Sequence, residues 1–319
     1  MPELPEVQTI VDDLNRKIKG DTIVGFWSDW PKAIKGVNFK KFEAEINGKK
    51  ILKAWRIGKN MFVDLSGGKT IYIHLKMTGH LLVKTRENFQ FPISPPKADQ
   101  PWAGNFQTNP NDKISNLEKN KNYFDDRVNQ YIHHIWKLKS GKTLEFSDMR
   151  KFAKIVLVDT DKVMELPEIK KLGVDAMSAD FTLEKFEEIL EKRKNKKIGL
   201  VLMEQELIAG IGNIYRSEIL FDAGIHPERL VKDLKKAETE TLYNSILKVL
   251  KKAVKMRGTS DSDYRDTDGA PGSFGKVLKV YRKKGEKCSC VRDGKKCGTI
   301  IERIIMGQRS VFFCQKCQK

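Results

Sequence analysis

Pro2 and Glu3 open the sequence with two residue types that could do covalent chemistry together. Initiator methionine is normally removed before a small residue such as proline, so we expect the working chain to begin with the secondary amine of Pro2. Roughly 10% of an ordinary α-amino group is neutral at pH 7, because its pKa lies near 7.7–8.0. A neutral amine can attack an electrophilic carbon and form a Schiff base, while the neighbouring Glu3 moves protons.

The cysteines give a second chemical signal, because all five lie after residue 287. Cys314 and Cys317 have a spacing that places two thiolates on one turn, as tetrahedral zinc requires. Cys297 stands a hairpin's length before them, and the fourth ligand is Cys288 or, as the alternative, Cys290. Four protein ligands leave no open position, so we expect one structural Zn²⁺ rather than a catalytic metal or disulfides.

The charge balance points to a polyanionic partner. The chain has 60 Lys and Arg against 42 Asp and Glu, a formal net charge of +18, which favours nucleic acid unless the whole proteome is lysine-rich. No apolar run approaches the roughly 20 residues that a membrane helix needs. The acidic start is not a secretory signal. We therefore expect a cytoplasmic protein, associated with the nucleoid and without a membrane partner.

Two kinds of secondary structure must position these groups. Apolar residues recur at helical spacing over residues 3–18, and Pro5 is tolerated in a first helical turn. From about 22 to 160 the pattern changes to short strands. Met61–Leu65 with Thr70–Leu75, and Tyr131–Leu138 with Thr143–Phe146, predict two hairpins around Gly-containing turns.

The rest of the chain divides into an insertion, a helical part, a loop and the cysteine tail. Residues 86–125 are rich in Pro, Asn and Lys, which predicts a long surface insertion. The pattern is helical from about 165 to 256, whereas 258–275 is polar and Gly-rich. We expect an α+β fold with a sheet-rich domain over 1–165, a second domain over 166–275 and a zinc-binding tail over 276–319.

Several segments carry a family resemblance, in order along the chain. The start, Pro2-Glu-Leu-Pro-Glu-Val7, and the cysteine tail are joined by His74-Leu-Lys-Met-Thr-Gly79, Phe146-Ser-Asp-Met-Arg-Lys-Phe152, and Gly210-Ile-Gly-Asn-Ile-Tyr215 followed by Ala223-Gly-Ile-His-Pro227. Together they resemble the formamidopyrimidine-DNA glycosylases, bacterial enzymes that excise 8-oxoguanine and ring-opened purines. The resemblance implies an N-terminal β-sandwich with an opening helix, a helix-two-turn-helix domain and a β-hairpin zinc finger.

The resemblance also implies roles for single residues near the chemistry. Pro2 would be the nucleophile, Glu3 the general acid and base, and Glu6 a supporting carboxylate unless it is simply an exposed helix residue. Lys59, in a Gly-Lys turn before a strand, matches the family's catalytic lysine. Arg309, near the tip of the finger, would complete this set by holding a phosphate.

Further residues match the family's DNA contacts. Met77, Arg150 and Phe152 would fill the gap that is left when a damaged base is flipped out of the stack. His74 and Asn213 would bind phosphates, the latter beside a helix start that offers N–H donors. One departure stands upstream, where Gly199 replaces a lysine that many members carry, so we expect Lys196 and Lys197 to compensate.

The implied function is a bifunctional glycosylase and abasic-site lyase acting on duplex DNA as a monomer, with successive β and δ eliminations. The loop at 258–275 matches the family's lesion-capping loop, although a flexible linker is the simpler alternative. This loop and the Pro-Glu-Leu-Pro-Glu start favour oxidised purines over oxidised pyrimidines. The alternative from another class is a protein that binds damaged DNA without cutting it.

Overall fold

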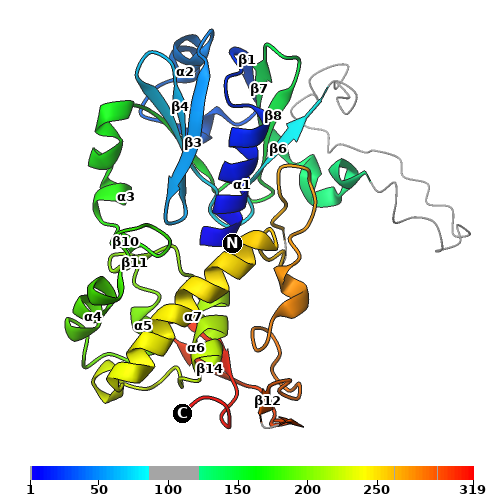
Figure 1. Cartoon of the computed structure of the whole chain (residues 1–319). Coiled ribbons are helices and arrows are strands. Elements are labelled where there is room, and N and C mark those ends of the chain that lie inside the picture. Colours follow the sequence, from blue (N-terminus) through cyan, green and yellow to red (C-terminus); the bar gives the residue numbers. More distant parts are fainter. Residues whose placement is uncertain (1, 86–121, 262, 293) are drawn as a thin grey trace, which may run out of the picture.

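The computed structural model describes residues 2–85, 122–261, 263–292 and 294–319 (Figure 1). The insertion expected over 86–125 therefore lies mostly outside the described residues. Its last part forms a short 3-10 helix over Tyr123–Asp125. Within the described residues, no helix is long and apolar enough to cross a membrane.

The opening helix, α1 (Leu4–Lys17), has the expected place. Glu3 is its N-cap, and Glu6 accepts a hydrogen bond from the Glu3 amide, so the two acidic residues form a capping box. Pro5 stands in the first turn, where its missing N–H costs nothing. One face of the helix buries Val7, Ile10 and Leu14 among other apolar residues.

Two sheets form the N-terminal half, as the sequence predicts. One has the order β1-β7-β8-β6 and the other β2-β9-β5-β4-β3, and an apolar cluster lies between them. Both predicted hairpins are present, as β4–β5 and β7–β8. The strands are β1 (Ile23–Ser28), β2 (Ile34–Lys35), β3 (Ile51–Ile57), β4 (Asn60–Leu65), β5 (Lys69–His74), β6 (His80–Lys84), β7 (Ile132–Leu138), β8 (Thr143–Ser147) and β9 (Lys154–Asp159).

The C-terminal half is mainly helical. Its helices are α3 (Pro167–Lys170), α4 (Leu183–Glu191), α5 (Ile198–Val201), α6 (Asn213–Ala223) and α7 (Lys236–Lys255). The tail adds the strand pairs β12 (Val291–Arg292) with β13 (Lys295–Lys296) and β14 (Glu302–Met306) with β15 (Arg309–Phe313). The mixed helices and strands in two halves confirm the α+β prediction.

The sequence patterns missed three short elements. The helix α2 (Phe39–Ile46) interrupts the region expected to be all strand, and Asn38 caps it by accepting from the Lys41 amide. Within the region expected to be helical, β10 (Val174–Asp175) pairs in parallel with β11 (Ile208–Ala209). Two-residue strands are too short to produce a periodicity, so no sequence pattern marks them.

Each half contributes one side chain to the core of the other. Leu4 of α1 lies in the apolar cluster of the C-terminal half, where its amide donates to the Gly210 carbonyl over 3.2 Å. Gly210 has φ +110°, and a Cβ there would lie 2.3 Å from the Leu4 side chain. Tyr264, from the 258–275 loop, lies in the cluster of the N-terminal half. The two halves therefore interlock.

The 258–275 loop is tied to α1 by a buried charge network. Arg257, at the start of the loop, has φ +61° and donates to Asp13 of α1 (2.5 Å) and to Asp266 (2.7 Å). Both carboxylates are almost fully buried, so leaving either without its partner would be costly. Thr267 also donates to Asp13. Among its described residues this segment is packed, which argues against the reading as a flexible linker.

Candidate functional site

The carboxylate of Glu3 sits on the N-terminus of α6. It accepts backbone N–H groups from Ile214 (3.0 Å) and Tyr215 (3.4 Å), the unpaired donors that open a helix. Gly212 leaves room for it, because a Cβ there would lie 2.2 Å from the Glu3 carboxyl carbon. Pro2 is buried immediately before Glu3. The two halves of the molecule thus meet at the predicted nucleophile and its acid–base partner.

Glu6 is a buried junction rather than an exposed helix residue. Its carboxylate accepts from the Glu3 amide (2.7 Å), the Tyr215 hydroxyl (2.5 Å) and the Thr259 amide (2.7 Å). Burial, and then the neighbouring charge of Glu3, raise the pKa of Glu6 to about 7. Near neutral pH this carboxyl group is therefore protonated in a large fraction of molecules.

Lys59 reaches the same place from the turn between β3 and β4. Its ammonium group donates to the Ile211 carbonyl over 3.0 Å, just before α6. Burial lowers the pKa of Lys59, although the charges of Glu3 and Glu6 act in the opposite direction. The structure thus brings Lys59, Glu3 and Glu6 together, as the resemblance implies.

An ion pair that the sequence did not reveal holds the Lys59 turn in place. Arg56 and Asp175 pair over 2.5 Å, with side chains 7% and 12% exposed. The same carboxylate oxygen accepts the Gly58 amide over 2.5 Å. Gly58 has φ +56° and approaches Ala209 closely, so a side chain would be strained there. This contact holds the Lys59 turn against the C-terminal half.

Met77, Arg150 and Phe152 form one exposed cluster. The exposed fractions of Met77 and Phe152 are 43% and 53%, which is unusual for such apolar residues. The Arg150 guanidinium lies 4.7 Å from the centre of the Phe152 ring and 3.2 Å from the Met77 sulfur. Composition would have assigned both apolar residues to the core, so only their motifs could identify them.

Asp148 positions this cluster and was missed as a site residue. It is fully buried, and its carboxylate accepts the backbone N–H groups of Phe152 and Ala153, each over 2.9 Å. It also accepts from the Thr78 hydroxyl, next to Met77. Asp148 stands inside the Phe146-Ser-Asp-Met-Arg-Lys-Phe152 motif, which could have marked it as a site residue. An aspartate in a loop, however, gives no sign that it will be buried.

His74 lies at the end of β5, half-buried near this cluster. Its Nδ1 accepts the Lys76 amide over 3.0 Å. Burial, followed by the charges of Lys76 and Lys59, lowers the pKa of His74 to about 4. The ring is therefore neutral at pH 7 and can act only as a neutral hydrogen-bond partner.

Asn213 and Arg309 both interact with the buried Arg216, the first by a hydrogen bond and the second through its charge. Asn213 is the first residue of α6, its side-chain oxygen accepts from Arg216 over 2.5 Å, and its side chain also hydrogen-bonds Tyr281. Arg309 begins β15 and is exposed. Its charge contributes to the lowered pKa of Lys59, so the finger and the Lys59 turn interact electrostatically.

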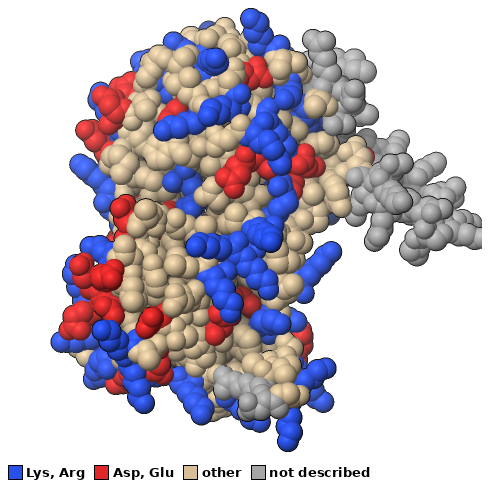
Figure 2. All heavy atoms as spheres, in the orientation of Figure 1, with Lys and Arg blue, Asp and Glu red and all other residues tan. Residues whose placement is uncertain are grey.

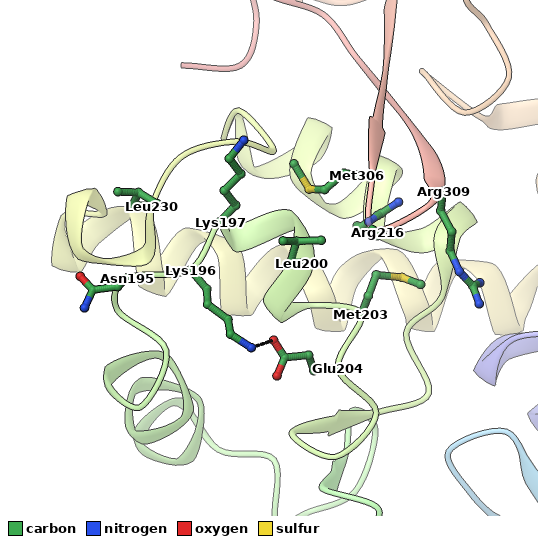
Figure 3. A pocket seen from close by; sticks show the side chains of 11 residues that line it. Asn195, Lys196, Lys197, Leu200, Met203, Glu204, Arg216, Leu230, Met306 and Arg309 are labelled. Atoms are coloured by element: carbon green, nitrogen blue, oxygen red, sulfur yellow. Dashed lines mark hydrogen bonds and ion pairs between the residues drawn. The ribbon is translucent and has the colours of Figure 1, made fainter.

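A hollow of about 690 Å³ separates the finger from α5 (Figure 3). Lys196 and Lys197 line it, but they pair with Glu204 (3.0 Å) and Glu228 (2.6 Å). Gly199 stands below, where a Cβ would lie 2.8 Å from the Met306 sulfur. The same Cβ would lie 2.8 Å from the Pro227 carbonyl oxygen, so this packing has no room for a side chain at position 199.

The four thiols of Cys288, Cys297, Cys314 and Cys317 lie within 4.8 Å of one another. The Cys288–Cys317 and Cys297–Cys314 sulfur pairs are each 3.8 Å apart. A tetrahedral zinc site with Zn–S bonds of about 2.3 Å has sulfurs about 3.8 Å apart, so the cluster fits this ion. The Cys290 thiol instead contacts the Val291 carbonyl, which resolves the choice in favour of Cys288.

Three family models match this chain. The formamidopyrimidine-DNA glycosylase N-terminal domain matches residues 1–155, its H2TH domain matches 172–265, and a zinc finger found in FPG and IleRS matches 290–319. The zinc-finger match and the cluster of four thiols together give the tail one structural Zn²⁺.

Relatives and solved structures are similar over the full length. The formamidopyrimidine-DNA glycosylase of Carboxydothermus hydrogenoformans is 36% identical over 319 residues, covering 100% of both chains. That of Pelotomaculum thermopropionicum is 34% identical, covering 100% of this chain and 99% of its own. Lactococcus lactis Fpg, solved with DNA containing an abasic site, superposes with a TM-score of 0.77 at 30% identity, covering 100% of both chains.

Proposed function

The chain belongs to the formamidopyrimidine-DNA glycosylase family, and from this premise we propose how its residues bind and cut damaged DNA. The protein is a DNA glycosylase of base-excision repair with abasic-site lyase activity. Its proposed substrates are 8-oxoguanine, formamidopyrimidines and abasic sites in duplex DNA. The observation that supports the assignment of residues is the meeting of Glu3, Glu6 and Lys59 beside Pro2.

The proposed reaction begins with the Pro2 nitrogen, once Met1 has been removed. The amine forms a bond to C1′ of the sugar as the bond from C1′ to the base breaks, and the departing base takes up a proton. The Pro2 nitrogen then loses its proton, and the C1′–O4′ bond breaks as O4′ takes up a proton, which opens the sugar ring and gives the iminium. The iminium makes a C2′ proton acidic, so its loss expels the 3′ phosphate, and loss of the C4′ proton in a second elimination expels the 5′ phosphate. Glu3 moves these protons, because its carboxylate is fixed beside Pro2.

The other residues bind the DNA around this centre. Lys59, His74, Asn213 and Arg309 contact the phosphates of the lesion strand. The Met77, Arg150 and Phe152 cluster enters the gap that the flipped base leaves, offsetting an unstacking cost of a few kcal/mol. The described part of the 258–275 loop offers backbone N–H groups to the lesion.

The same set supports an enzyme that acts as a monomer. Every proposed site residue comes from this one chain, so no second copy is needed to complete the site. Light scattering of the protein with and without one equivalent of duplex DNA tests this state. A dimer that persists at nanomolar concentration would contradict it.

Borohydride trapping on a duplex with 8-oxoguanine opposite cytosine tests the nucleophile. Reduction of the Schiff base should give a covalent protein–DNA adduct, and this adduct should be lost in Pro2→Gly and in a chain with an N-terminal tag. Pro31→Gly, at the start of a short 3-10 helix remote from Glu3 in sequence, serves as the matched control and should keep it. An undiminished adduct in Pro2→Gly would exclude Pro2.

A lesion panel separates the substrate classes. Lactococcus lactis Fpg has also been solved with DNA that contains an oxidised pyrimidine, so such lesions belong in the panel. We expect faster cleavage of 8-oxoguanine than of thymine glycol. Tight binding without scission of any lesion would instead indicate a protein that only recognises damage.

A further inference from the structure

A basic groove that the proposed reaction does not use lies beside Phe152. It has a volume of about 520 Å³, and its walls include two aromatic residues, Trp30 and Phe152. Five lysines also line it, and three of them are Lys32, Lys35 and Lys76. No acidic side chain lines it. The groove follows β2, which pairs with β9 in the five-stranded sheet.

The charges in the groove differ in their partners. Lys151 lies 4.0 Å from Asp29, and Lys154 pairs with Glu168. Lys32, Lys35 and Lys76 are exposed and form no ion pair with any other residue that the structure describes. Lys76 feels the charge of Glu168, but none of the three forms an ion pair, and three ammonium groups in one groove repel one another. An anionic ligand with repeated charges would relieve this repulsion.

The groove is continuous with the cluster that enters the DNA stack. Phe152 belongs to both, and Lys76 directly precedes Met77. Lys76 and Lys151 have φ values of 54° and 53°, the left-handed region that non-glycine residues rarely adopt. The β5–β6 and β8–β9 loops therefore each hold a strained backbone at a lysine that lines the groove.

We propose that this groove binds the phosphate backbone of the DNA strand opposite the lesion. The contact lies beyond the orphaned base, which is the base that loses its partner when the lesion is flipped out. The inference rests on the proposed function, in which Arg150 and Phe152 face that base. The lesion strand is held on the other side by Lys59 and Arg309. A strand that follows the groove from Phe152 meets Lys76, Lys32 and Lys35, while Trp30 supplies an apolar wall for the sugars.

The salt dependence of binding measures these contacts directly. Each neutralised phosphate contributes about 0.9 to the slope of log K against log[salt] on duplex DNA. The triple variant Lys32→Gln, Lys35→Gln and Lys76→Gln should therefore lower the magnitude of this slope by about 2.7. The probe is a duplex with a tetrahydrofuran abasic analogue, which the enzyme cannot cleave through a Schiff base.

A matched triple variant controls for the change in total charge. Lys19, Lys40 and Lys139 are exposed lysines without an ion pair among the described residues. Lys139 stands at the end of the β7–β8 hairpin away from Ser147 and the Phe152 loop. Replacing these three by Gln removes the same charge and should leave the slope within about 0.5 of the wild type. A drop equal to that of the groove variant would overturn the proposal.

Shortened duplexes identify the strand. The lesion strand is kept intact, while the opposite strand is cut back to the orphaned base from one side or the other. One truncation should lower the wild-type slope by about 2.7 and leave the groove variant unaffected. If the difference in slope between the wild type and the groove variant is the same on both truncated duplexes, the lysines contact the lesion strand and the proposal fails. Wild-type trapping on the same preparation reports the proposed function separately, because it does not depend on the groove.

Discussion

Glu6 connects three distant parts of the chain. One carboxylate receives the N-cap amide of α1, the hydroxyl of Tyr215 in α6 and the amide of Thr259 in the 258–275 loop. Any change in its charge therefore affects Glu3 beside the proposed nucleophile Pro2, the helix α6 and the 258–275 loop. Burial makes that charge sensitive to pH near neutrality.

The stability of the protein should fall as Glu6 ionises. Its folded-state pKa of about 7 lies above the ordinary 4.5, so folding favours the protonated form. This contribution is complete below pH 4.5 and is lost as the pH rises through 7, by at most about 3 kcal/mol. Glu6→Gln should remove this decline in urea titrations between pH 5 and 8, although the variant is less stable at pH 5 because it loses acceptors.

Glu240→Gln is the control for this titration, because Glu240 is exposed on α7. It should show the same pH dependence as the wild type. A Glu6→Gln variant that still loses stability between pH 5 and 7 to the wild-type extent would contradict the assignment to Glu6.

Residues with a motif could be predicted, whereas residues that act through burial could not. Pro2, Glu3 and Lys59 could be proposed as catalytic because their order along the chain matched a family. Tyr215 and Asp148 stood inside quoted motifs, yet their roles depend on hydrogen bonds to atoms far away in sequence. Asp175 lay in no motif, and its pairing with Arg56 arises only when the two halves meet.

At the scale of elements, the zinc finger depends on which cysteine completes the tetrad. Cys288→Ser should lose most of the bound zinc and, with it, the support of the β14–β15 hairpin that carries Arg309. Cys290→Ser should keep one zinc per chain, because that thiol lies outside the cluster. Zinc content by atomic absorption separates the two, and equal loss in both variants would contradict the ligand set.

The contact of Glu3 with the start of α6 requires a glycine at position 212. Gly212→Ala would place a Cβ 2.2 Å from the Glu3 carboxyl carbon. We expect a loss of about 1–3 kcal/mol in unfolding free energy and a large fall in borohydride trapping, because the carboxylate must leave the helix N-terminus. Gly275→Ala is the matched control, since its Cβ would meet its nearest atom at 3.8 Å. Equal behaviour of the two variants in thermal unfolding would refute this account.

Elements with a strong pattern were predictable to within a residue or two. The helix α1 and both hairpins follow from apolar periodicity and Gly-containing turns. The 3.6-residue pattern of α2 is only eight residues long, so it was overlooked among strands. The β10–β11 pair brings Gly173 so close to Leu207 that a Cβ would lie 2.1 Å from the Leu207 carbonyl oxygen, a contact that no local pattern encodes.

At the scale of the whole molecule, the Arg56–Asp175 pair joins the halves. Asp175→Ala leaves the Arg56 guanidinium buried without its partner, so we expect a loss of about 3–5 kcal/mol in urea unfolding. Replacing both residues by apolar ones should recover much of this loss. Asp159→Ala, which removes exposed pairs with Lys69 and Lys162, should cost far less. A loss of that small size in Asp175→Ala would show that the pair does not join the halves.

The exchange of Leu4 and Tyr264 between the two cores bears on how the chain is made. The N-terminal half lacks one of its buried aromatic rings until Tyr264 has been synthesised, on the order of 5–20 s after the last strand of its second sheet, β9. Leu4 likewise lacks its partner until Gly210 has been synthesised. A nascent chain on the ribosome thus carries two unfinished cores, and the active site closes only as synthesis nears its end.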